Sequence, residues 1–147
     1  MSNKKLYYKW KQFDLDISSI ISIIKDRQWN IRGVYGIPKG GLIPAVVIAN
    51  ILDAQLFTNI RTVQGNILDP EEILIIDDIS DTGKTLIGIK DITKYKTITL
   101  YIKEGTKFMP DYYLHKCKRE EWLVFAWEEN EHIKEYSSRC ERDNTNI

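Results

Sequence analysis

The sequence from residue 73 to residue 85 reads ILIIDDISDTGKT. It opens with an uninterrupted apolar run rich in β-branched residues, which is typical of a strand buried on both faces of a parallel sheet. Two adjacent carboxylates, Asp77 and Asp78, follow at once. We expect them where the strand leaves the sheet, because ligands of open α/β sheets bind outside the carboxyl ends of strands. Apolar residues spaced by three come after the polar loop, so this loop is predicted to open a helix.

The polar loop has the composition of a phosphate site. Free backbone N–H groups at a helix start attract anions. Thr82 and Thr85 add hydroxyl donors, Lys84 adds a positive charge, and Gly83 lets the backbone approach a ligand closely. A third carboxylate, Asp81, stands beside these donors. The pattern therefore predicts a ligand with one phosphate for the loop, and a ribose diol or a metal ion for the carboxylates.

Two other interpretations explain less of this stretch. A nucleoside-triphosphate P-loop requires a glycine five residues before Gly83, where this chain has Asp78. Three carboxylates would also repel a triphosphate. A surface turn whose acids only cap a helix needs a single acid, whereas this loop combines three acids with two threonines.

The stretch resembles the PRPP-binding motif of type I phosphoribosyltransferases, which is an apolar run, two acids and then D-T-G-x-T (PRPP is 5-phosphoribosyl 1-diphosphate). The resemblance extends over about residues 5–128. It implies an α/β fold: a mostly parallel sheet flanked by helices, with a small hood from the N- and C-terminal segments. It also implies that Asp77 and Asp78 hold the ribose diol and Mg²⁺, that the loop 81–85 binds the 5-phosphate, and that Asp81 accepts a proton from the purine.

A second strand–loop–helix unit precedes this one. Residues 31–37 read as a buried strand, residues 38–41 read PKGG, and a helix is predicted over residues 42–52 with Pro44 in its first turn. Lys39 can offer charge, and Gly40 and Gly41 can turn backbone N–H groups toward an anion. Alone, the pattern equally suits an ordinary turn.

The resemblance implies that this second loop grips pyrophosphate. The run KGGLIPA, residues 39–45, looks most like the R-G-G-L-x-P run of the 6-oxopurine branch. Lysine in place of arginine keeps the charge but loses the bidentate fork. The family can also carry a cis peptide before the basic residue, which would here join Pro38 to Lys39.

Purine contacts are implied in the C-terminal third. Lys103 ends a predicted strand over residues 97–103, where purine branches of the family place a lysine that donates to O6. Residues 122–128 read WLVFAWE and resemble the W-x-x-x-P-W-[DE] end of bacterial xanthine–guanine phosphoribosyltransferases, with Ala126 where proline is usual. By that resemblance Trp122 covers a purine face and the backbone of Leu123 meets its 2-position. The alternative for Lys103 is a strand-end lysine that faces solvent, and the alternative for residues 122–128 is an ordinary hydrophobic strand.

The chief departure from the family pattern lies before the acidic strand. A third strand is predicted over residues 55–63, and only residues 64–72 then connect it to the acidic strand. The family normally has a long mobile lid there. The missing lid favours an alternative function, a non-catalytic PRPP- or nucleotide-binding regulator on the same fold. The main prediction is a purine-salvage enzyme that transfers the 5-phosphoribosyl group to guanine, xanthine or hypoxanthine.

Composition bounds the remaining possibilities. A chain of 147 residues suits one domain, predicted over residues 1–136, with a polar tail over 137–147. Basic and acidic residues balance at 21 each, so no global field points to nucleic acid. No apolar run suits a membrane span, and the two cysteines lack metal-ligand spacing, so a cytoplasmic location is expected. The family resemblance adds a homo-oligomer, a dimer or a tetramer.

Two smaller expectations concern the polar residues outside the motifs. Asp14 or Asp16 is predicted to cap a first helix that ends near residue 28. His115 and His132 are predicted to be surface residues, because neither has metal-ligand partners in the sequence.

Overall fold

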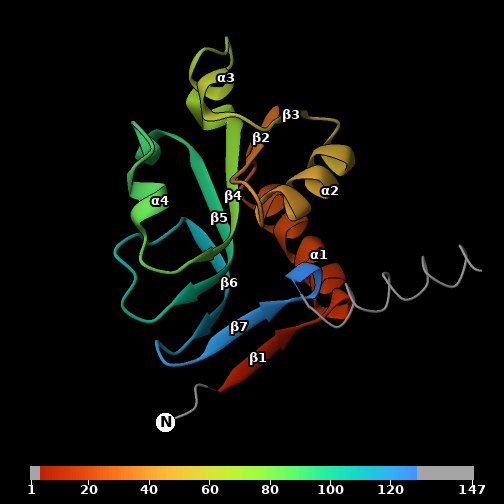
Figure 1. Cartoon of the computed structure of the whole chain (residues 1–147). Coiled ribbons are helices and arrows are strands. Elements are labelled where there is room, and N and C mark those ends of the chain that lie inside the picture. Colours follow the sequence, from red (N-terminus) through yellow and green to blue (C-terminus); the bar gives the residue numbers. More distant parts are fainter. Residues whose placement is uncertain (1–3, 129–147) are drawn as a thin grey trace, which may run out of the picture. The chain divides into compact units, whose positions relative to one another are not determined.

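A computed structural model describes residues 4–128, which form two compact units. One unit is residues 14–119, and the other combines the segments at the two chain ends. The larger unit contains a five-stranded parallel sheet in the order β3-β2-β4-β5-β6 (Figure 1). The parallel sheet of the expected fold class is therefore confirmed. Its strands are β2 (Gly33–Gly36), β3 (Gln55–Phe57), β4 (Ile73–Ser80), β5 (Lys96–Lys103) and β6 (Tyr112–Cys117).

The direction in which the chain adds strands reverses between β2 and β4. From β2 the chain moves outward to the edge strand β3, and it then passes β2 again to place β4 on the other side. In open parallel sheets such a reversal leaves a crevice at the carboxyl ends of the two central strands, because their connections depart in opposite directions. The residues that follow β2 and those at the end of β4 are placed together in this way.

Helices cover both faces of the sheet. Helix α2 (Leu42–Leu52) packs against β2, β3 and β4, and α4 (Lys84–Ile87) lies across the sheet from it (Figure 1). The α2 bounds agree with the sequence prediction, including Pro44 in the first turn. The other helical segments of this unit are α1 (Trp10–Asp26), which begins in the chain-end unit, α3 (Ile60–Gln64), and the 3-10 turns Pro70–Glu72 and Ile92–Lys94.

Strand β4 is the centre of the core and is longer than the sequence predicted. Its four leading apolar residues are at most 1% exposed. Its pairing with β2 ends at Ile76, but its pairing with β5 continues to Ser80. Asp77 and Asp78 consequently lie within the strand. They extend past the end of β2 on one side, while the strand still pairs with β5 on the other. The expectation that they follow the strand directly was wrong on the β5 side.

The helix predicted after the phosphate loop is only α4, a single turn. Gly88 caps its end, and glycine weakens a helix by about 1 kcal/mol relative to alanine. Asp91 then takes a left-handed backbone conformation with φ of 58°, which a continuous helix excludes. The apolar residues spaced by three are divided between the turn and the segment that follows it.

The connection before β4 also differs from the prediction. Strand β3 stops at Phe57, and Asn59 then starts α3, because its side chain accepts a hydrogen bond of 2.8 Å from the Arg61 backbone N–H. Residues 58–72 therefore separate the two strands, rather than residues 64–72. The connection is longer than expected and has helical structure of its own.

The first helix begins earlier than predicted, at Trp10, so Asp14 and Asp16 are interior residues and neither caps it. Asp16 is buried, and its Oδ2 lies 2.8 Å from Nε2 of His115 on β6. His115 was expected at the surface, but only 29% of its side chain is exposed. The burial of Asp16 explains the difference, since a buried carboxylate requires a polar partner.

The chain-end unit contains a small parallel sheet, and the expected hood stays a prediction. Strand β1 (Lys5–Tyr8) pairs with β7 (Trp122–Phe125), and a 3-10 turn, Ala126–Glu128, follows. Aromatic rings pack within this unit: Phe125 stacks on Trp127 with ring centroids 4.9 Å apart, and Tyr8 meets Phe125 edge-on at 5.3 Å.

Among the described residues, no helix has the length and apolar character needed to cross a membrane. His132, Cys140 and the predicted tail over 137–147 lie outside the described residues. The division into a domain over 1–136 and a tail stays a prediction, as does the cytoplasmic location.

Candidate functional site

The loop after β2 and the end of β4 touch at the crevice between these strands. A Cβ atom on Gly40 would lie 1.9 Å from Oδ2 of Asp78, and a Cβ atom on Gly41 would lie 2.5 Å from the carbonyl oxygen of Ile76. No side chain fits at either glycine without moving its neighbour. The peptide bond between Pro38 and Lys39 is cis, as the resemblance implied. The two predicted ligand-binding segments are therefore brought together.

The loop after β2 presents donors. Within residues 4–128, the backbone N–H groups of Lys39 and Gly40 donate to no backbone carbonyl. The Lys39 side chain is exposed, and the next amide, that of Gly41, bonds to Ile37 at 2.9 Å. Two successive amides and one ammonium group at the rim of the crevice suit a multiply charged anion.

Asp77 and Asp78 form a coupled carboxylate pair. Asp77 is 9% exposed and Asp78 is half-buried. Oδ1 of Asp77 accepts from the Asp78 backbone N–H at 2.8 Å, and Oδ1 of Asp78 accepts from Ile79 at 2.8 Å. Burial, together with the neighbouring Asp78 charge, raises the pKa of Asp77 to about 8. Burial also raises the pKa of Asp78. A cation or a pair of hydroxyl groups would stabilise the ionised pair.

The residues present fit Mg²⁺ as ligands. Among the described residues, no group of three or more histidine, cysteine or acidic side chains is placed to hold a metal ion. Mg²⁺ does not need such a cage, because it keeps several waters and binds through one or two carboxylates and substrate oxygens. The adjacent carboxylates of Asp77 and Asp78 supply hard oxygen donors of that kind.

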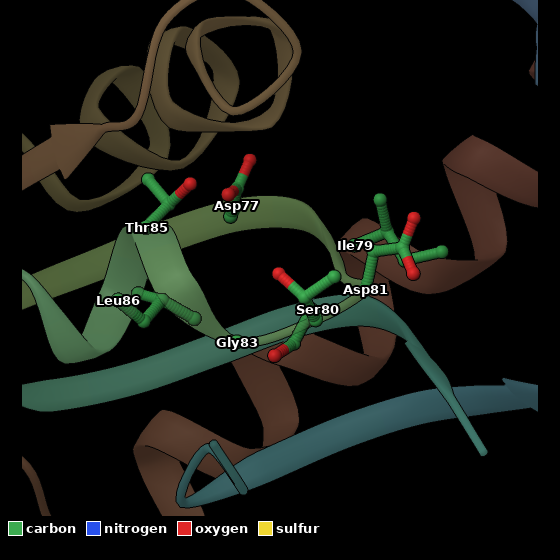
Figure 2. A pocket seen from close by; sticks show the side chains of 8 residues that line it. Asp77, Ile79, Ser80, Asp81, Gly83, Thr85 and Leu86 are labelled. Carbon is green, nitrogen blue, oxygen red and sulfur yellow. The ribbon is translucent and has the colours of Figure 1, made fainter. Parts of the chain in front are cut away.

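The loop after β4 encloses a small concave site of about 70 Å³. Gly83 has a φ of 88°, and a Cβ atom there would lie 2.5 Å from the Phe108 backbone nitrogen, so only glycine fits. Within the described part of the chain, the N–H groups of residues 82, 83, 85 and 86 donate to no backbone carbonyl. Figure 2 shows Asp77 and Thr85 with their side chains on the same side of the site. The lining residues are Asp77, Ile79, Ser80, Asp81, Thr82, Gly83, Thr85 and Leu86.

A larger cleft of about 510 Å³ adjoins this site, and the sequence did not predict it. Thr85 lines both spaces. The walls of the larger cleft include Ile60 and Gln64 of α3, Tyr35 of β2, and Lys84. No signal could have revealed it, because the α3 segment was predicted to be part of a strand.

The lysine expected to recognise the base is not solvent-facing. Lys103 ends β5 opposite Cys117 and is 8% exposed. Its carbonyl oxygen accepts from the Thr106 N–H at 3.0 Å, which closes a turn that contains Gly105 at φ of 83°. The reading of Lys103 as a solvated strand-end residue is wrong.

Asp81 has a partner that the sequence did not single out. Arg119 donates to Oδ1 of Asp81 and, at 2.9 Å, to the Asp81 carbonyl oxygen. Both side chains are about half exposed, at 47% for Arg119 and 51% for Asp81. The basic stretch KCKR, residues 116–119, was the available signal, but nothing in the sequence pairs Arg119 with a loop 38 residues away.

The two remaining purine candidates belong to the chain-end unit. Trp122 is 58% exposed and Leu123 is buried. Trp122 and Leu123 stay predicted purine contacts.

No family model matches the chain. The xanthine-guanine phosphoribosyltransferase of Desulfotalea psychrophila is 28% identical over 134 residues, which cover 81% of this chain and 83% of that protein. The crystal structure of a purine phosphoribosyltransferase from Pyrococcus horikoshii is 32% identical, with a TM-score of 0.70 over 86% of this chain and 95% of that one. The Helicobacter pylori xanthine-guanine-hypoxanthine phosphoribosyltransferase, at 18% identity and a TM-score of 0.73, shares the fold over 91% of this chain and 99% of its own.

Proposed function

We propose that this chain, which belongs to the purine phosphoribosyltransferase family, transfers the 5-phosphoribosyl group of PRPP to a 6-oxopurine and releases pyrophosphate. Guanine, xanthine and hypoxanthine are the proposed acceptors. The family membership rests on the Pyrococcus horikoshii relative, and the names of the curated relatives support a role in purine salvage.

The contact between Gly40 and Asp78 carries the proposal. It joins the basic glycine loop to the carboxylate pair, and the amide-lined loop follows on the same strand. PRPP bears a diphosphate, a ribose diol and a 5-phosphate in that order along the molecule. We assign them in the same order to Lys39 with Gly40 and Gly41, to Asp77 with Asp78, and to residues 81–85.

The proposed reaction breaks the bond between the anomeric carbon and the pyrophosphate oxygen. The bonding electrons leave with pyrophosphate, the carbon gains oxocarbenium character, and a purine nitrogen forms the new bond. Holding both reactants in line supplies much of the rate, and donors at the departing pyrophosphate supply more. The purine N–H proton goes to the Asp81 carboxylate, a general-base role that contributes typically about 10²–10⁴-fold.

Three residues are proposed to select the base. The Lys103 ammonium donates to O6 of the purine, Trp122 stacks on one face, and the Leu123 backbone meets the 2-position. Stacking provides affinity for any flat ring, whereas a donor aimed at O6 rejects a base that lacks this oxygen.

Mg²⁺ is the proposed cofactor, held by Asp78 with Asp77. When bound, it neutralises the charge of the diphosphate and orients the ribose hydroxyls. The raised pKa of Asp77 is consistent with a carboxylate that awaits a cation or a diol, because burial and a like charge destabilise the ionised form.

The test is incubation of the purified protein with PRPP, Mg²⁺ and each nucleobase in turn, with nucleotide and pyrophosphate measured by chromatography. Guanine, xanthine or hypoxanthine should give nucleotide, and EDTA should abolish it. Adenine and uracil serve as controls. Mg²⁺-dependent binding of PRPP with no nucleotide from any base would instead support the regulator, and preference for adenine would overturn the role of Lys103.

A homo-oligomer is part of the proposal. Helix α2 is apolar almost throughout, and its Val46 and Ile51 are exposed, as is Leu56 on the edge strand β3. A helix that is apolar all round is typically buried. Val46→Asp should lower the molecular mass measured by light scattering, whereas Ile67→Asp, at a residue that is 98% exposed, should not.

A further inference from the structure

Arg119 connects two segments that contribute to the proposed site. Its Nη1 donates to Oδ1 of Asp81 and its Nη2 to the Asp81 carbonyl oxygen at 2.9 Å. Its Nε and Nη2 also donate to the carbonyl oxygen of Glu104, at 3.0 and 2.8 Å. One guanidinium group therefore serves three acceptor atoms on two loops. A half-exposed ion pair contributes little stability by charge alone, but a planar fork with several acceptors fixes direction.

The two segments are those expected to meet the purine. Asp81 is the proposed proton acceptor, and Glu104 directly follows Lys103, the proposed donor to O6. Other bonds already join these loops: the Lys107 N–H donates to Thr82 O at 3.0 Å, and Ser80 Oγ lies 2.9 Å from Thr106 Oγ1. Neither of those bonds reaches the Asp81 side chain. Arg119 is the described residue that ties this carboxylate to the turn after Lys103.

We propose that Arg119 is a positioning residue, which orients the Asp81 carboxylate and sets its distance from Lys103. The inference rests on the proposed function. The bonds to Arg119 use Oδ1 and the main-chain oxygen of Asp81. Among the described residues, Oδ2 makes no hydrogen bond and is the oxygen left for the purine N–H. Arg119 acts through Asp81 and needs no contact with the purine.

Removal of Arg119 should impair purine use more than PRPP binding. A displacement of about 1 Å can lower a rate by about 10²-fold. We expect Arg119→Ala to lower kcat/KM for guanine by about 10- to 100-fold at saturating PRPP. The dissociation constant for PRPP should change by less than about threefold, because the amides of residues 82–86 remain. Arg119→Lys should recover little, since an ammonium group cannot serve all three acceptors.

The matched control is Arg32→Ala. Arg32 is also exposed and also bonds a carboxylate, that of Glu72 at 3.3 Å, but it precedes β2 at the opposite end of the strand from the Gly40 loop. Its removal should leave both constants within about twofold. Thermal unfolding of all three variants verifies that each is folded. Should Arg119→Ala not fold, Arg119→Lys provides the comparison.

The outcomes separate the inference from the function on which it rests. If the unaltered protein makes nucleotide and Arg119→Ala resembles Arg32→Ala, the inference alone is overturned. It is also overturned if Arg119→Lys restores full activity, or if PRPP affinity and purine use fall together. If the unaltered protein makes no nucleotide, the proposed function fails, and hydrogen exchange then decides the inference. The amides of Lys107 and Thr106, which donate to the carbonyl oxygens of Thr82 and Lys103, should exchange faster in Arg119→Ala than in Arg32→Ala, and equal rates would reject it.

Discussion

Replacing Gly40 with alanine tests the contact on which the proposed function rests. The added Cβ atom would lie 1.9 Å from Oδ2 and 2.5 Å from Cγ of Asp78, and real Cβ contacts are essentially never shorter than 3.0 Å. The Asp78 carboxylate or the loop must therefore move by about 1 Å or more. Such a displacement of a catalytic group can lower the rate by about 10²-fold, and overpacking typically costs about 1–3 kcal/mol of folding free energy.

The assay compares Gly40→Ala with Gly65→Ala. In Gly65→Ala the nearest atom, the Arg61 carbonyl oxygen, would lie 3.3 Å from the new Cβ atom, far less crowded. Calorimetry with PRPP and Mg²⁺ gives the affinity, and initial rates with guanine give kcat/KM. We expect kcat/KM to fall by about 10²-fold in Gly40→Ala, and to change by less than threefold in Gly65→Ala. Unaltered PRPP affinity and turnover in a folded Gly40→Ala protein would refute the assignment of Asp78 and of this crevice.

Three further changes give separate tests. Asp81→Asn should lower turnover by about 10²–10⁴-fold with PRPP affinity nearly kept, as measured by initial rates and calorimetry; unchanged turnover would remove Asp81 from catalysis. Lys103→Ala should weaken the use of hypoxanthine and guanine far more than the binding of PRPP, and equal losses would contradict its role at O6. Asp77→Asn should flatten the pH dependence of stability without Mg²⁺. The pKa of Asp77 is raised from 3.8 to about 8 in the folded state, so the folded state holds a proton that the unfolded state loses. The free energy of unfolding should therefore fall as the pH rises toward 8, by up to about 1.4 kcal/mol per pH unit. Urea titrations at several pH values measure this dependence. If Asp77→Asn keeps the full dependence of the unfolding free energy on pH, another group titrates.

The sequence predicted the parts of the fold that depend on local pattern. The buried run before Asp77 and the helix with Pro44 in its first turn were both found, because continuous apolar residues and a proline at a helix start have few alternatives. Segments set by tertiary contacts were predicted less well. Strand β4 continues past its apolar run because β5 pairs with it, and α3 replaces a predicted strand because the Asn59 side chain caps it.

The candidate site was likewise predicted only in the parts that depend on local sequence. Glycine and carboxylate spacing located the two loops at the crevice, but nothing local shows that Gly40 touches Asp78 or that Arg119 reaches Asp81. Each of these contacts joins residues about 40 positions apart and depends on the order of strands in the sheet. His115 was placed at the surface because it has no metal-ligand partners in the sequence, and the sequence does not reveal its actual partner, Asp16, on a helix 99 residues earlier.

The pairing of β1 with β7 has a consequence for how the protein is made. Strand β1 leaves the ribosome well before its hydrogen-bonding partner β7, which ends at Phe125. At about 5–20 residues per second, translation leaves β1 without this partner for roughly ten seconds, while the larger sheet can already assemble. The chain-end unit must therefore close last, after residue 125 has left the exit tunnel. A stop codon shortly before Trp122 would release a chain that has every strand of the larger sheet and none of the base-stacking surface proposed for Trp122.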